Sequence, residues 1–191
     1  MTPQGCPSPT LQPRQLLRPN FQEGGSSHSS SPEQLHGLIS ELAKCRDLVQ
    51  GMVFGTPVRQ CIRHILEATI NSKHQEQQYN FVHAVVKVIL NLGRAESGTP
   101  ERQPKHGQVE SIRRIIYRLG DTILVAKTGY GKTIVLQTVS VIMEDRVTLQ
   151  LIPLSRLGED QLQSIARIPG ARPLLLSDET VKVCTLVRPT K

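Results

Sequence analysis

The segment that most restricts how this chain can fold is a short glycine turn, Ala126-Lys127-Thr128-Gly129-Tyr130-Gly131-Lys132-Thr133. It matches the phosphate-binding pattern G-x-x-x-x-G-K-[ST] except at the first position, which is alanine. Gly129 and Gly131 allow backbone conformations that aim several N–H groups at one point, which forms a nest for an anion. The turn therefore predicts a site for the phosphates of a nucleotide.

The residues on either side of the turn have the pattern that a phosphate site needs. The apolar, β-branched run 122–125 predicts a buried strand, and an amphipathic helix is expected from Lys132 to about Met143. Lys132 would reach the β- and γ-phosphates, and the Thr133 hydroxyl would be a ligand of Mg²⁺. We therefore expect ATP and Mg²⁺ as cofactors, with Lys132 and Thr133 as catalytic residues. A dinucleotide-binding turn is disfavoured, because no third glycine follows Gly131 at the required spacing.

Strands and helices alternate along the second half of the chain. The expected order is a helix, a strand, the glycine turn and its helix, a strand, a helix and a last strand, over residues 109–119, 122–125, 132–143, 147–152, 156–166 and 173–176. Short connections between alternating strands and helices are typical of a doubly wound parallel sheet. The fold class predicted for this part is therefore α/β.

The first half of the chain divides differently. Residues 1–32 hold six of the thirteen prolines and a glycine–serine run, which predicts a disordered tail. Residues 33–93 predict a small all-α unit. Its first helix is marked by a capping box formed by Ser31 and Gln34, its second restarts at Thr56-Pro57, and its third runs from about 75 to 92. Residues 94–106 have the composition of a linker.

The apolar face of the first helix is expected to be buried in the helical unit. It comprises Leu35, Leu38, Ile39, Leu42, Cys45 and Val49. Residues 33–93 contain no catalytic or metal-ligating motif that we recognise. The function that we consider for this unit is therefore to bind a protein partner.

Composition excludes several classes of protein. No apolar run approaches the ~20 residues of a membrane-spanning helix, so no membrane partner is expected. The four cysteines lie far apart, which excludes a zinc ribbon and a disulfide framework and favours a reducing intracellular compartment. Aromatic residues are only 3% of the chain, too few for base stacking along a single strand. A net charge of +7 suits contact with DNA through its phosphate backbone.

Residues 107–180 resemble the first motor domain of superfamily-two helicases, most closely the RecQ-like DNA helicases. Four features carry the resemblance: Gly107-Gln108, Gly120-Asp121, Gln137 on the helix after the turn, and the run 151–161, Leu-Ile-Pro-Leu-Ser-Arg-Leu-Gly-Glu-Asp-Gln. The last run is similar to the motif that lies along the DNA strand in this family.

The resemblance implies a fold and a set of site residues. Residues 107–191 would form an incomplete RecA-like domain in which Gln108 hydrogen-bonds adenine and residues 126–133 hold the phosphates. The DNA backbone would be contacted by Pro153, Ser155, Arg156 and Thr180. A nuclear location also follows from the resemblance alone.

One further segment, Leu174 to Thr180, has two interpretations. An apolar run followed by Asp178 and Glu179 is typical of a Mg²⁺-holding Walker B site, but Asp178 lies only 46 positions (178 − 132) after Lys132. That distance is short for the family, and the place after the DNA-contacting run suits a second backbone-contacting motif containing Thr180. We prefer the second interpretation, and Asp178 as a catalytic residue remains the alternative.

Three functions follow from these residues. The first is the ATP-binding and DNA-binding N-terminal portion of a RecQ-like 3′–5′ helicase. The chain contains no D-E-x-H box and no second motor domain with an arginine finger, so this portion is expected not to unwind DNA alone. The second is a non-enzymatic module that binds DNA and a protein. The third is a small NTPase that uses Asp178.

Overall fold

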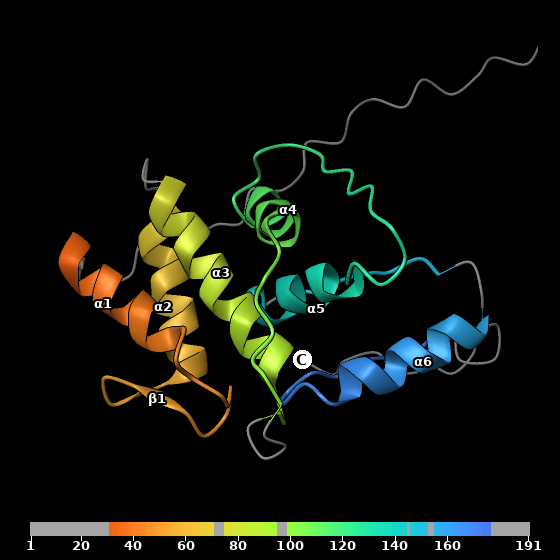
Figure 1. The fold of residues 1–191 in the computed structure, drawn as a ribbon, viewed down its shortest axis with the longest axis horizontal. Helices are drawn as coiled ribbons and strands as arrows, with labels where there is room; N and C mark the ends of the chain where they lie inside the picture. Colours follow the sequence, from red (N-terminus) through yellow and green to blue (C-terminus); the bar gives the residue numbers. More distant parts are fainter. Residues whose placement is uncertain (1–30, 71–74, 95–98, 145, 153–154, 177–191) are drawn as a thin grey trace, which may run out of the picture.

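The computed structural model describes residues 31–70, 75–94, 99–144, 146–152 and 155–176. Within these ranges the chain forms six helices and one two-stranded antiparallel sheet, so the fold is mixed α and β (Figure 1). The tail predicted over residues 1–32 lies outside the described residues, apart from its last two positions. No helix in the described ranges has both the length and the apolar character needed to cross a bilayer.

Helix α1 (Pro32–Leu42) confirms the capping box predicted from the sequence. The Ser31 hydroxyl accepts from the Gln34 N–H at 3.2 Å, and the Gln34 side chain accepts from the Ser31 N–H at 3.1 Å. Leu35, Ile39 and Leu42 are buried, as the helical spacing requires. The predicted apolar face ends there, because α1 stops at Leu42 and Val49 lies in an exposed turn beyond it.

A small hairpin follows, which the sequence interpretation missed. Strands β1 (Met52–Val53) and β2 (Thr56–Pro57) pair antiparallel across a two-residue turn. Both turn residues have positive φ, 49° at Phe54 and 82° at Gly55, as a tight primed turn between twisted strands requires. The helix predicted to restart at Thr56-Pro57 therefore begins only at Val58, as α2 (Val58–Ile70).

Helix α3 (Gln75–Asn91) lies at the centre of the molecule and confirms the third predicted helix. Figure 1 shows it between α1 and α2 on one side and the two following helices on the other, α4 (His106–Ile116) and α5 (Thr133–Ile142). Its buried side chains form one apolar cluster with residues of all four neighbours. The cluster therefore spans the predicted boundary between the helical unit and the phosphate-binding part.

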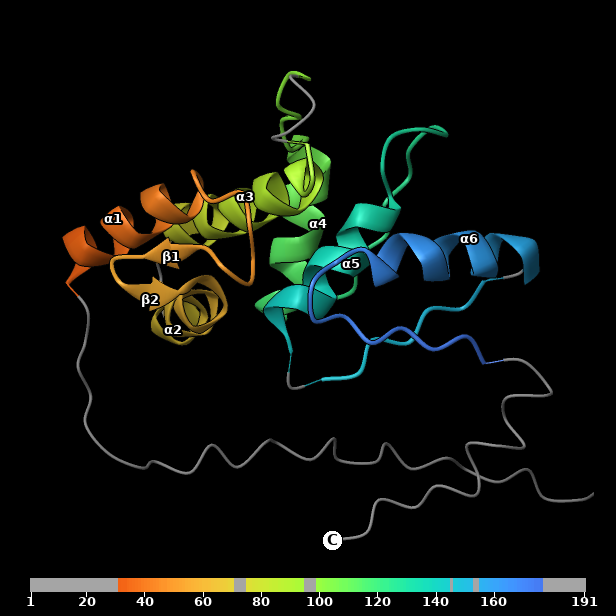
Figure 2. The same ribbon diagram turned by 90° about the horizontal axis from the view of Figure 1, so that it is seen from below.

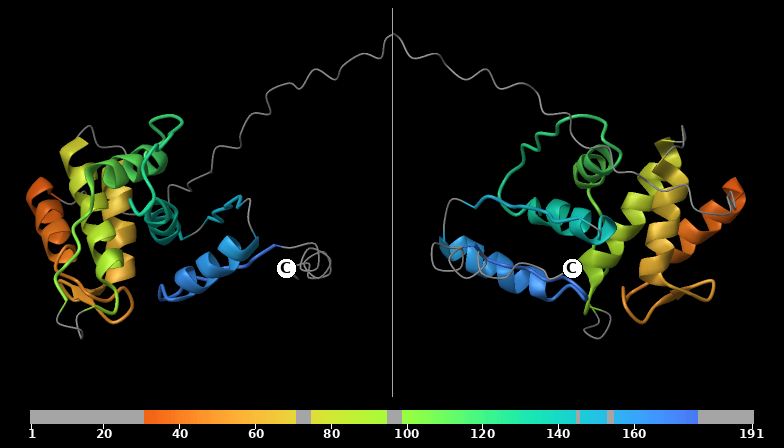
Figure 3. Two further views of the ribbon diagram at one scale, coloured as in Figure 1. Left: turned by 45° about the vertical axis from the view of Figure 1, so that its right-hand side comes forward. Right: turned by 180° about the vertical axis from the view of Figure 1, so that it is seen from behind.

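Helix α6 (Ser155–Ala166) lies beside α5, on the side away from α1 and α2 (Figures 2 and 3). The Gln137 side chain of α5 donates to the Ser164 hydroxyl of α6 at 3.2 Å. After α6, Ile168 is buried against the cluster. The observed starts and ends of α3, α5 and α6 agree with the sequence predictions to within a residue. Helix α4 begins and ends three residues earlier than the predicted 109–119, so its first residue, His106, lies in the predicted linker.

The expected parallel sheet does not form among the described residues. Segments 121–127, 147–152 and 171–176 are extended, and side-chain burial alternates along each, yet no ladder joins them. One set of side chains is half-buried, while the other is exposed, its apolar members from 52% at Leu176 to 96% at Val147. Parallel strands are stable when both faces of their sheet are covered, and here only one face of each segment meets the protein.

The shared core makes a prediction about helix α4. Ile112 is fully buried against the cluster, whereas Ile115 on the same helix is 37% exposed. We expect Ile112→Ala to lower the free energy of unfolding by about 2–5 kcal/mol, and Ile115→Ala by less than about 1 kcal/mol. Urea unfolding of the two variants measures both values. Equal, small losses would contradict a core shared between α3 and α4.

Candidate phosphate-binding site

The glycine turn lies at the end of a long loop that leaves α4 and returns to the start of α5 (Figures 1 and 2). Gly129 and Gly131 have φ of +79° and +89°, conformations that other residues rarely adopt. The Tyr130 N–H donates to the Lys127 carbonyl at 3.2 Å and closes the turn. Helix α5 then begins at Thr133, and the Ile134 N–H donates back to the Gly131 carbonyl at 3.2 Å.

The Lys132 side chain folds back across the turn that precedes it. Its ammonium donates to the Ala126 carbonyl at 2.7 Å and to the Lys127 carbonyl at 3.1 Å. An ammonium has three N–H donors, so one of them is left for an anion. Lys132 is exposed, so this charge lies at the surface next to the start of α5.

Gln108 lies against the turn from the first turn of α4. Its side-chain nitrogen donates to the Tyr130 carbonyl at 3.0 Å and to the Gly131 carbonyl at 3.2 Å. Its side-chain oxygen accepts from the Lys105 N–H at 2.9 Å, which caps the helix. The residue is 2% exposed. The structure thus brings Gln108, predicted as a nucleotide-binding residue, into direct contact with the turn.

Lys105 contacts the same turn, although nothing in the sequence interpretation singled it out. Its ammonium donates to the Tyr130 carbonyl at 3.0 Å and lies 4.5 Å from the centre of the Tyr130 ring, a cation–π distance. The contact joins residues 25 positions apart, and a lysine in a linker-like segment gives no sign of it. The available signal was the position of Lys105 just before the helix start, three residues ahead of Gln108.

The start of α4 is itself held by α3. The Tyr79 hydroxyl lies 3.1 Å from Nδ1 of His106, and the Asn91 side chain exchanges hydrogen bonds with the Arg102 backbone at 2.8 and 3.0 Å. A hollow of about 380 Å³ separates α4 from residues 121–124 next to this attachment. Residues of both charge signs line it, so it offers no uniform field for an anion.

The remaining predicted site residues are only partly described. Thr133 is half-buried in the first turn of α5. Ser155 and Arg156 begin α6, which places their backbone at a helix start. Pro153, Asp178 and Thr180 lie outside the described residues. In the described part of the chain, no three His, Cys, Asp or Glu side chains are grouped as metal ligands.

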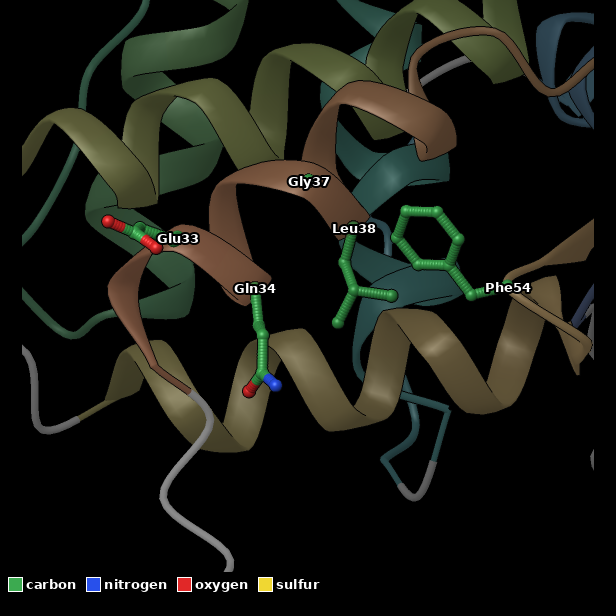
Figure 4. A pocket seen from close by; sticks show the side chains of 5 residues that line it. All are labelled: Glu33, Gln34, Gly37, Leu38 and Phe54. Carbon is green, nitrogen blue, oxygen red and sulfur yellow. The ribbon is translucent and has the colours of Figure 1, made fainter.

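A second hollow lies on the helical unit, away from the glycine turn. Figure 4 shows the Phe54 ring beside Leu38 and under Gly37 of α1, and the hollow there has a volume of about 530 Å³. Two carbon atoms of the Phe54 ring, Cε2 and Cζ, lie 3.7 Å from where a side chain at Gly37 would begin. Phe54 is 67% exposed, which is unusual for an aromatic ring.

Comparison of the chain with protein-family models, with curated proteins and with solved structures finds no match.

Helix α4 carries an ion pair between Glu110 and Arg113, and Arg113 also reaches α3. Two nitrogens of the Arg113 guanidinium, Nε and Nη2, donate to the Glu110 carboxylate at 2.9 Å, and Nη1 lies 3.4 Å from the Gln78 side-chain oxygen of α3. The hydrogen bond from Arg113 lowers the pKa of Glu110 despite its partial burial. Arg113 is buried at the α3–α4 contact, so Glu110 compensates a charge that lies out of water.

The lowered pKa predicts how stability changes in acid. The pair's contribution is present above the ordinary carboxyl pKa of about 4.3 and is lost as the pH falls through the lower folded value. We expect Glu110→Gln to reduce stability by about 1 kcal/mol at pH 7, with the difference from wild type closing below about pH 4. Glu67→Gln, on the exposed face of α2, is the matched control. Urea unfolding across this pH range measures both, and a pH-independent loss would exclude the ion pair as the cause.

Proposed function

We propose that residues 126–133 bind the phosphates of a nucleoside triphosphate. The observation that carries the proposal is the conjunction of two glycines with left-handed φ, a lysine ammonium folded over the turn, and the start of α5 at Thr133. A helix start and a nest of backbone N–H groups both favour negative charge. The Thr133 hydroxyl would supply one Mg²⁺ ligand, beside oxygens of the phosphates themselves.

We further propose that this site belongs to the N-terminal portion of a RecQ-like DNA helicase. Support comes from the motif resemblance and from three extended segments whose alternating burial suits strands of an incomplete parallel sheet. The start of α6 at Ser155 would carry backbone contacts to DNA, with the chain's net positive charge favouring phosphate. A nuclear location remains part of this proposal.

A second candidate is a module that binds a protein partner through the helical unit. It is favoured by the exposed Phe54 ring at the hollow on α1. Nucleotide titration separates the candidates, because a wild-type chain that binds no nucleotide leaves only the module. A small NTPase using Asp178 is the third candidate, and ATP hydrolysis that is lost in Asp178→Asn would favour it.

The proposed site predicts a strong dependence on Lys132. We expect Lys132→Ala to raise the Kd for Mg·ATP by at least about tenfold, because charge-assisted hydrogen bonds to phosphate are lost. Lys127→Ala also removes one positive charge from the turn but leaves the Lys132 ammonium in place. We expect it to change the Kd for Mg·ATP by less than about threefold. Calorimetric titration measures both. If the two substitutions changed the Kd equally, Lys132 would contribute only positive charge to the turn, and its assigned contact with phosphate would be contradicted.

The helicase proposal also predicts what the isolated chain does not do. In related NTPases the loss of an arginine finger lowers the rate about 10³–10⁵-fold, and the resemblance over residues 107–180 covers only the first motor domain, which does not supply one. We expect the 191-residue protein to bind Mg·ATP without measurable unwinding of a fluorescently labelled DNA duplex. ATP-dependent strand separation by the purified chain would refute this expectation.

A further inference from the structure

Gln108 already uses most of its hydrogen-bonding capacity within the chain. A carboxamide has two N–H donors and one carbonyl oxygen, and recognition of adenine needs one donor and one acceptor together. Both donors of Gln108 are directed to the Tyr130 and Gly131 carbonyls, and its oxygen accepts from the Lys105 backbone. To read adenine, Gln108 would have to release the glycine turn.

The contacts of Gln108, together with the Ile134 N–H that also donates to the Gly131 carbonyl, fix which way the turn's amides point. In a trans peptide the carbonyl of one residue and the N–H of the next are directed oppositely. Holding the Tyr130 carbonyl toward α4 therefore turns the Gly131 N–H away from α4, and holding the Gly131 carbonyl does the same to the Lys132 N–H. Among the described residues neither N–H is paired with a backbone acceptor, so both remain available to an anion.

Two more features show how closely α4 fits the turn. A side chain at Gly131 would begin only 2.6 Å from the Gln108 nitrogen, and one at Gly107 only 2.7 Å from the Tyr130 hydroxyl. The Lys105 ammonium adds a second donor to the Tyr130 carbonyl. The first turn of α4 therefore holds the peptides on both sides of Gly131 through several independent contacts.

We infer that Gln108 is a positioning residue that orients the Gly131 and Lys132 amides toward phosphate, and that the site takes triphosphates with little regard to the base. The inference rests on the proposed phosphate site and specifies its ligand class. It assigns recognition to the phosphate chain, because the side chain expected to discriminate adenine is committed to the protein backbone.

The test compares three ligands and two variants of the full chain. Mg²⁺ complexes of ATP, GTP and inorganic tripolyphosphate are titrated calorimetrically into wild type, Gln108→Met and Gln78→Met. Gln78 is the matched control, since it is a buried glutamine whose side chain donates to the Thr69 carbonyl at 3.2 Å and lies 3.4 Å from Nη1 of Arg113, both outside the glycine turn. Thermal melting of each protein shows whether it is folded.

We expect the three ligands to bind wild type within about threefold of one another, since the base contributes little. Gln108→Met should raise the Kd of all three ligands alike, by about tenfold. Gln78→Met should leave each Kd within about twofold of wild type, however much it changes the melting temperature. In ¹⁵N spectra, tripolyphosphate should shift the Gly131 and Lys132 amides in wild type and in Gln78→Met, and less in Gln108→Met. A purely structural role for Gln108 would not separate the two variants in this way.

Two results would overturn the inference, and they differ in meaning. ATP binding at least about tenfold tighter than GTP and tripolyphosphate, with the preference lost in Gln108→Met, makes Gln108 the base-reading residue and leaves the proposed function intact. Absence of binding by all three ligands to folded wild type removes the phosphate site itself. If Gln108→Met does not fold, the ratio of the three wild-type affinities still decides whether the base is read.

Discussion

Helix α4 is attached on both sides, and the candidate site depends on that double attachment. Apolar residues of α4, with Ile112 at their centre, pack into the cluster around α3, and the first turn of α4 donates hydrogen bonds to the glycine turn. A turn rich in glycine loses more conformational entropy on folding than other segments. Its ordered conformation therefore relies on contacts from a helix that the core has already fixed in place.

The same arrangement explains why the two halves of the chain share one core. Residues 99–105 join α3 to α4 along the surface of α3, where the Lys87 ammonium lies 3.0 Å from the Glu101 carboxylate. Asn91 adds hydrogen bonds to the backbone of the same stretch. Side-chain contacts from α3, and not linker composition, decide how these residues lie.

The extended segments 121–127, 147–152 and 171–176, unlike α4, are held by the rest of the protein on one face only. Leu124 packs against the core, while its neighbours Ile123 and Val125 are both 90% exposed. Leaving such a face in water costs about 25 cal/mol per Å² of apolar surface. An isolated loop therefore gains no stability from the alternating apolar side chains. This is the part of the fold where local pattern and observed structure differ most, because a strand needs partners that the segment itself does not contain.

Helices were predictable to the degree that their signals are local. The capping box at Ser31 and the helix expected from about 75 to 92 were both predicted from residues within or next to the element itself, and both are confirmed. The Phe54-Gly55 turn was missed because phenylalanine gives no sign of positive φ. For the candidate site, the motif located Lys132 and Thr133 at the start of α5, whereas the Lys105–Tyr130 contact joins distant residues and left no local pattern.

By itself, then, the sequence determined that residues 126–133 form a glycine turn before a helix, since φ preferences and helix periodicity are properties of neighbouring residues. It also determined the apolar face of α1 through Leu35, Ile39 and Leu42. Only the tertiary structure decided that Gln108 bonds the Tyr130 and Gly131 carbonyls and that, within the described part of the chain, the apolar runs after α4 and α5 form no ladder. Both outcomes depend on which distant groups lie within hydrogen-bonding distance, and that is fixed by how the helices pack around α3.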